Sequence, residues 1–169
     1  MAVPAANNGA PNWSRDGESI YFYSDDRGRF QLWKMPLKGG SPVRVTTNGG
    51  VYGIESKDGR FLYYSKFSGS GIWKKSLDGG QDSRLPINAA SWYNWDVAGS
   101  GIYFLNLKFP PSGRIEFFDF ANGQSTPIFA LDKPASLYGG LALSPDGKSI
   151  LFGQSELNES YIMLMKNFR

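Results

Sequence analysis

Three aspartates are the residues whose type and spacing first suggest chemistry. Asp16, Asp58 and Asp146 each precede a glycine in the same pattern, Ser-x-Asp-Gly. Gathered in one place, three carboxylates would form an acidic ring able to hold a cation. However, an aspartate in such a turn accepts hydrogen bonds from the amides of its own turn. The acidic and basic stretch 25–29, expected as a loop between the second and third strands, also lacks the alternating spacing of a calcium loop. We therefore predict structural turns, no metal site and no cofactor.

A second candidate site is aromatic. Tyr52, Tyr93 and Tyr138 each introduce an expected first strand of a repeat, and Trp95 follows closely after Tyr93. Rings with a polar tip suit the recognition of peptides or small ligands. If the first strands line a central channel, these four residues would gather at one mouth of it. The alternative is that the rings wedge neighbouring sheets together. We predict Tyr52, Tyr93, Trp95 and Tyr138 as a ligand-binding or partner-binding site.

Basic residues near tryptophans form a third candidate surface. The formal net charge is only +3, which is too small by itself to indicate a nucleic-acid partner. Charged residues on outer strands commonly protect a sheet edge from pairing, although basic and aromatic residues together can bind single strands. We predict no direct binding of nucleic acid. The residues concerned are Trp33, Lys34, Arg44, Trp73, Lys74, Lys75 and Arg84.

The composition excludes several kinds of active site. The chain has no Cys and no His, which excludes disulfides, thiolate chemistry and any imidazole base. It also has no Gly-x-Ser-x-Gly nucleophile elbow, so we predict that it is not an enzyme. No apolar run approaches the roughly 20 residues needed to span a bilayer. Residues 1–8 have no basic and no apolar stretch, so we do not expect them to be a signal peptide. A bacterial cytoplasmic or periplasmic location is left open.

An internal repeat indicates the fold. The Ser-x-Asp-Gly pattern starts at Ser14, Ser56 and Ser144, and a degenerate copy starts at Val97, giving spacings of 42, 41 and 47 positions. Each copy precedes an apolar, aromatic strand. An Asp-Gly pair between apolar runs is a strong hairpin signal. Four strands in every ~40 to 45 residues are typical of a propeller blade.

We therefore predict an all-β fold, a single β-propeller domain over 1–169 with four four-stranded antiparallel blades. The last repeat ends after its third strand, and residues 2–6 are expected to supply the missing strand and close the ring. The alternative is that two chains form one eight-bladed ring. The expected blades span approximately 11–50, 51–90, 91–135 and 136–169 plus 2–6.

These repeats resemble those of a known family. The Ser-x-Asp-Gly turn, the following aromatic strand and the segment 32–40, Leu-Trp-Lys-Met-Pro-Leu-Lys-Gly-Gly, are similar to the repeat of TolB-like propellers, which are distantly WD-repeat-like. The ending, from Gly140 onward, is similar to the C-termini of large bacterial regulators in which a winged helix precedes such a propeller. The resemblance implies a sensor domain.

Two functions follow as predictions. The first is a non-catalytic module that binds or senses a protein or small-molecule ligand, as part of a larger bacterial regulator-like protein. The second is a structural propeller that assembles with a second copy of itself, as a homodimer. A TolB-like envelope protein is a third possibility. For all three functions, we predict no membrane span within this sequence.

Overall fold

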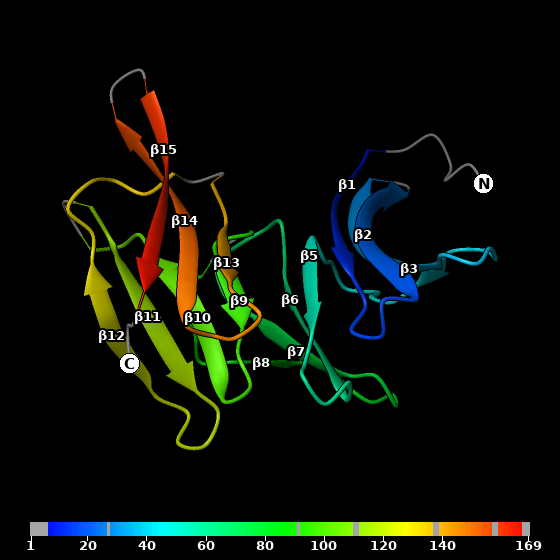
Figure 1. The fold of residues 1–169 in the computed structure, drawn as a ribbon. Coiled ribbons are helices and arrows are strands. Elements are labelled where there is room, and N and C mark those ends of the chain that lie inside the picture. The colour runs from blue at the N-terminus through cyan, green and yellow to red at the C-terminus, as the bar shows by residue number, and fades with distance from the viewer. Residues whose placement is uncertain are drawn as a thin grey trace. The chain divides into compact units, whose positions relative to one another are not determined.

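The fold consists entirely of β-strands and connections. The computed structural model describes residues 7–26, 28–90, 92–109, 112–136, 139–156 and 159–166. Fifteen strands and no helix occur in these residues, and they form four antiparallel sheets (Figure 1). The predicted all-β fold of four propeller blades is therefore confirmed. The chain divides into two compact units, which are Met1–Leu85 and Pro86–Arg169.

Unit 1 holds the first two blades, and each has four strands in chain order. The strands of the first blade are β1 (Asn8–Trp13), β2 (Ser19–Asp26), β3 (Arg29–Pro36) and β4 (Val43–Arg44). Those of the second blade are β5 (Tyr52–Glu55), β6 (Phe61–Ser65), β7 (Trp73–Ser76) and β8 (Ser83–Arg84). The stretch 25–29, expected as a loop, is mostly strand, because Asp26 pairs with Arg29 across a tight turn at Gly28.

Unit 2 holds the third and fourth blades. The third blade comprises β9 (Trp95–Val97), β10 (Gly101–Asn106), β11 (Arg114–Asp119) and β12 (Ser125–Ala130). The fourth comprises β13 (Leu141–Leu143), β14 (Ser149–Glu156) and β15 (Glu159–Lys166). Its sheet therefore has three strands among the described residues. The expected closing strand, residues 2–6, lies outside them.

The Ser-x-Asp-Gly turns have the same hydrogen bonds in all three copies. In the first, the Ser14 hydroxyl donates to Asp16 at 2.6 Å, and the Glu18 amide donates to the same carboxylate at 2.9 Å. Gly17 has a φ of 70°, which a residue with a Cβ adopts at a cost. The bonds within each turn hold the pKa of the aspartate carboxyl below its ordinary value. Ser56–Asp58 and Ser144–Asp146 repeat the geometry.

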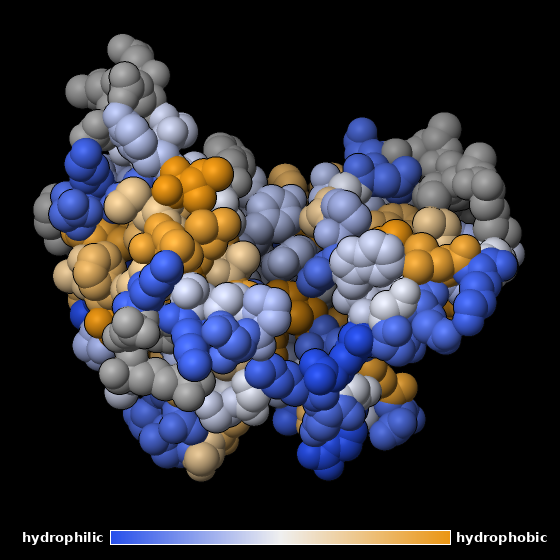
Figure 2. Space-filling view, viewed as in Figure 1, coloured by the Kyte–Doolittle hydropathy of each residue, from blue (hydrophilic) through white to orange (hydrophobic). Residues whose placement is uncertain are grey.

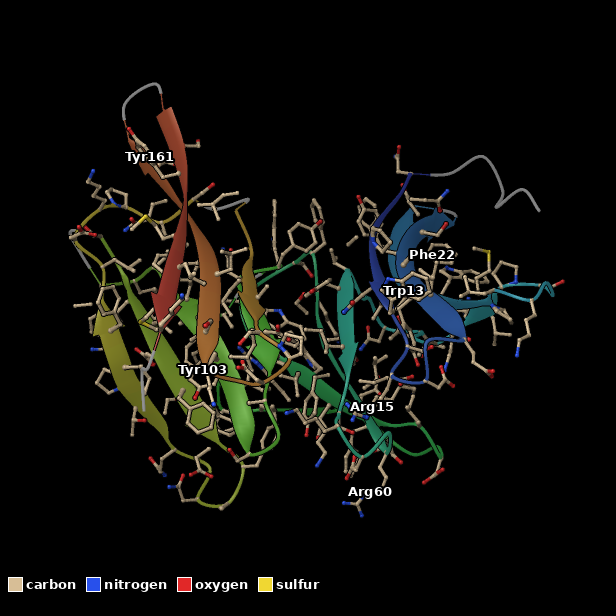
Figure 3. All side chains as sticks on the ribbon, in the orientation of Figure 1. Trp13, Arg15, Phe22, Arg60, Tyr103 and Tyr161 are labelled. Carbon is tan, nitrogen blue, oxygen red and sulfur yellow. The ribbon has the colours of Figure 1, made fainter. Side chains whose placement is uncertain are left out.

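Within each unit, a carboxylate on a first strand links the two blades. Glu55, at the end of β5, accepts a hydrogen bond from the Arg15 amide at 2.7 Å, and β1 lies beside β5. Figure 3 labels Arg15 at the turn that follows β1. Asp96, at the corresponding position in β9, accepts a bond from the Leu143 amide at 2.7 Å. Separate sheets share no ladder hydrogen bonds. These two carboxylates therefore connect neighbouring blades through side-chain hydrogen bonds instead.

Apolar side chains fill the space between blades. In unit 1 the buried cluster comprises Tyr21 and Leu32 from the first blade with Leu62 and Tyr64 from the second. Gly53 lets β5 approach the first blade closely, because a Cβ there would lie 3.0 Å from Leu32. In unit 2, side chains of β10 and β11 pack against those of β13 and β14 in the same way.

One face of the fourth blade is apolar and exposed. Leu151 pairs with Leu164, and Gly153 pairs with Ile162, so these positions share a face of the β14–β15 sheet. The exposed fraction of Ile162 is 77%. Apolar side chains gather over β14 and β15 in the space-filling view (Figure 2), and Figure 3 places Tyr161 on β15. Edge strands of this kind are prone to pairing with another chain.

Candidate functional site

The predicted aromatic residues fall in different parts of the chain. Tyr52, the first residue of β5, is half-buried in unit 1 and pairs with Ser65 of β6. Tyr93 is half-buried in unit 2, where its carbonyl accepts a hydrogen bond from the Leu141 amide at 3.0 Å. Tyr138 lies outside the described residues. Tyr52 and Tyr93 therefore occupy the same position of their repeats, shortly before the end of the first strand.

Trp95 differs from the two tyrosines because it is completely buried. It pairs with Phe104 of β10, and its indole N–H donates to the Trp92 carbonyl at 2.8 Å. The polar tip of the ring is therefore already bonded within the protein. A partner that approached this segment would meet the half-buried Tyr93 and Trp92 before it met Trp95.

The three repeated aspartates act within their turns, as predicted. Each carboxylate accepts hydrogen bonds from its own turn. The described residues contain no group of three or more carboxylate, His or Cys side chains that could hold a metal ion.

A groove in unit 1 is the strongest candidate for a binding site. Two adjoining pockets of about 560 and 380 Å³ share Asn48 and Lys66. Their walls come from the β2–β3 turn, the loop before β5, the segment that follows β6 and the β7–β8 turn. We call this the Lys66 groove; its lining residues lie within 28–31, 47–49, 64–68, 73–75 and 80–82.

Buried hydrogen bonds fix one wall of the Lys66 groove. The Gln31 side chain is almost fully buried, and its Oε1 accepts bonds from the Thr46 hydroxyl and the Gly49 amide, both at 3.0 Å. The Thr46 hydroxyl accepts in turn from the Leu32 amide at 2.9 Å. Gly49 has a φ of 89°, and the Lys66 stem passes close to it. The loop is thus held in place before any ligand binds.

Lys66 occupies the middle of the groove. Its ammonium lies 4.5 Å from the centre of the Trp73 ring and 5.8 Å from that of Tyr64, both within cation–π range. Partial burial lowers the pKa of Lys66, and the charge of Asp82 opposes this shift. Asp82 itself pairs with Lys75 at 3.0 Å and accepts the Tyr64 hydroxyl at 2.7 Å. Among the described residues, no carboxylate forms an ion pair with Lys66.

An aromatic platform forms one end of the groove. Phe30 and Phe67 stack with ring centres 4.9 Å apart and an interplanar angle of 23°. Tyr23 meets Phe30 edge-on at 5.2 Å. The exposed fraction of Phe67 is 53%, and Arg29 beside it is also exposed. The groove therefore presents an apolar surface next to two cations.

This groove could hardly be predicted from the sequence. Its members come from two repeats and from loops, where spacing predicts no shared surface. The one available signal is charge: residues 1–85 hold twelve Lys and Arg against eight Asp and Glu, whereas residues 86–169 hold six against seven. The basic excess thus belongs entirely to the unit that contains the groove.

Comparisons with known proteins identify the fold. No family model and no curated protein sequence matches the chain. Among solved structures, TolB from Acinetobacter baumannii is 20% identical, with a TM-score of 0.80 over 99% of this chain and 42% of that chain. A TolB-type protein of Agrobacterium tumefaciens is 24% identical, with a TM-score of 0.75 over 95% and 58%. The chain therefore has a TolB-like β-propeller fold.

The similar structures also include an enzyme. An oligogalacturonate lyase in complex with manganese is 15% identical, with a TM-score of 0.62 over 91% of this chain and 50% of that chain. At these identities the likeness concerns the fold alone, and one fold serves many functions. This chain spans 42% to 58% of the length of these three proteins. Among the described residues there is no helix suited to crossing a membrane.

Proposed function

We propose that this chain is a non-catalytic module that binds a partner through the Lys66 groove and the neighbouring loops. The observation that carries the proposal is the groove itself. It combines an exposed ring, Phe67, with an ammonium that has no carboxylate partner among the described residues. Ligand sites commonly join apolar walls to a few placed polar groups.

The proposed mechanism is rigid presentation. The blade sheets and the buried Gln31 bonds fix the loops, so binding a partner would not incur the entropic cost of ordering them. Tyr52 lies at the same end of β5 as the groove, because it pairs with Ser65, the residue before Lys66. Of the four predicted aromatic residues, Tyr52 is therefore the one placed near the groove in unit 1.

The tyrosine prediction can be tested with four defined probes. These are a short acidic peptide, a short basic peptide, oligogalacturonate and oligothymidylate, each titrated by isothermal calorimetry. We expect at least one probe to bind saturably without being consumed. Replacing Tyr52, Tyr93 and Tyr138 together by alanine should weaken that binding at least about tenfold, because aromatic side chains dominate interfaces.

Circular dichroism of the triple variant serves as the control for folding, and it should match that of the parent. The proposal fails if no probe binds saturably, and the tyrosine prediction fails if the folded triple variant binds as tightly as the parent. Release of unsaturated uronates from oligogalacturonate, with or without manganese, would instead show a lyase. That outcome would overturn the non-catalytic part of the proposal.

The wider biological role rests on resemblance and is proposed on that basis. A sensory portion of a larger bacterial regulator would use the groove to register its ligand. A TolB-like envelope protein would use it to hold a protein partner. The similar TolB structures support the second role. A cytoplasmic location would fit the regulator, and a periplasmic location would fit the envelope protein.

Assembly with a second copy is the second candidate function. The observation that favours it is the apolar face of β14–β15, which exposes Leu151, Ile162 and Leu164. We expect light scattering after size exclusion to give a mass above the 18.7 kDa of one chain as concentration rises. Replacing Ile162 and Leu164 by serine should then return the mass to that of one chain. A single-chain mass at every concentration would contradict self-assembly.

A further inference from the structure

We infer that the Lys66 groove is a site for an acidic peptide segment that carries an aromatic side chain beside its carboxylates. This inference rests on the proposed binding function and specifies its ligand. Three features carry it: the charge of the groove, the single exposed ring at its end and the fixed loop that forms its wall.

The charge of the groove favours a carboxylate. The Lys66 ammonium is partly removed from water and lies over the rings of Trp73 and Tyr64. The charge of Asp82 acts on Lys66 from nearby, but that carboxylate forms its ion pair with Lys75, at 3.0 Å. A ligand carboxylate would therefore gain a charge-assisted contact at a cation that is already partly desolvated.

The aromatic end of the groove favours one apolar side chain. Phe67 stacks on Phe30 and is 53% exposed, so a ligand can reach the solvent-facing part of this aromatic pair. Arg29 stands beside this platform, where it can meet a second carboxylate. A peptide with an aromatic residue between acidic residues supplies all of these groups: a ring for the platform and carboxylates for Lys66 and Arg29.

Other anionic polymers fit the groove less well. Single-stranded nucleic acid stacks successive bases on a series of exposed rings. Here the Trp73 ring already carries Lys66 at 4.5 Å and Arg84 at 5.4 Å, and Tyr64 is completely buried. A uronic-acid oligosaccharide has carboxylates but no aromatic group for the Phe67 platform.

The test compares two capped peptides by isothermal calorimetry, using the full chain. One has the sequence Glu-Asp-Phe-Asp-Glu, and the other has the matched amides, Gln-Asn-Phe-Asn-Gln. We expect saturable binding of the acidic peptide only, weakened by added salt. The Lys66→Gln and Phe67→Ser variants should each bind about tenfold more weakly or worse. Both changes are at partly or largely exposed side chains, and circular dichroism verifies that the variants fold.

Lys57→Gln is the matched control, since it removes one exposed positive charge from the turn at the opposite end of β6. It should leave the affinity for the acidic peptide within about twofold. Equal binding of the two peptides would overturn the inference, as would unchanged affinity in Lys66→Gln. If oligogalacturonate or oligothymidylate binds through Tyr52 and the acidic peptide does not bind, the inference fails while the proposed binding function stands.

Discussion

Replacing Glu55 by alanine should lower the free energy of unfolding of unit 1 by about 3–5 kcal/mol, the usual cost of removing one partner of a buried ion pair. The Glu55 side chain is only 7% exposed, and it serves three groups of the first blade. It accepts the Tyr21 hydroxyl at 2.5 Å, the Lys34 ammonium at 3.2 Å and the Arg15 amide at 2.7 Å.

The loss is large because all three donors would be left without this acceptor. Tyr21 is fully buried, and burial together with its bond to Glu55 raises the pKa of the phenol, which therefore remains a donor. Urea unfolding followed by circular dichroism measures the effect. Hydrogen exchange of β2 and β5 amides shows whether the loss is confined to unit 1.

Two further substitutions make the comparison specific. Glu55→Gln keeps an acceptor for Tyr21 but loses the charge, so its cost should be smaller, about 1–2 kcal/mol. Glu18→Ala removes an exposed pair with Lys38 and should cost less than about 1 kcal/mol. If Glu55→Ala lowers the free energy of unfolding as little as Glu18→Ala does, Glu55 is not what links the first two blades.

Trp95→Ala is the second large effect, with an expected loss of about 3–5 kcal/mol from the stability of unit 2. The side chain is completely buried and its N–H donates to the Trp92 carbonyl, so truncation leaves a cavity and removes that hydrogen bond. Guanidinium unfolding monitored by circular dichroism is the suitable measurement, because the substitution itself alters tryptophan fluorescence.

Phe129→Ala in β12 is the control from the same unit, and its side chain is 42% exposed. It should cost about 1 kcal/mol, in proportion to the smaller apolar area that it buries. Trp95→Phe separates stability from recognition. We expect it to destabilise unit 2 but to leave probe binding unchanged; a folded Trp95→Phe variant that loses binding would place Trp95 in the site.

The repeated local signals predicted the sheets well. The Asp-Gly turns at 16–17, 58–59 and 146–147 have the expected geometry, because each turn is closed by its own serine, aspartate and glycine. The strands that follow begin within one residue of the expected positions, as for β2, β6, β10 and β14. Even the copy without Asp-Gly forms its turn, since the Ala98 amide bonds to the Gly101 carbonyl.

The candidate site was much less predictable. Four residues were chosen because aromatic rings recur before the first strands. Burial then separated them: Trp95 is fully enclosed, whereas Tyr52 and Tyr93 remain half-exposed. Sequence spacing locates a residue along a strand, but the exposed fraction depends on what neighbouring sheets contribute. The prediction that these residues bind a partner still requires the probe experiment.

By itself, the sequence determined the class of fold, the number of blades, the turns and the absence of imidazole and thiol chemistry, because these depend on residue type and on contacts a few positions apart. Only the tertiary structure decided that Glu55 links two blades and that Lys66, Asn48 and Phe67 line one groove. Those residues come from different repeats and loops. Their proximity results from the packing of one sheet on the next, which has no period in the sequence.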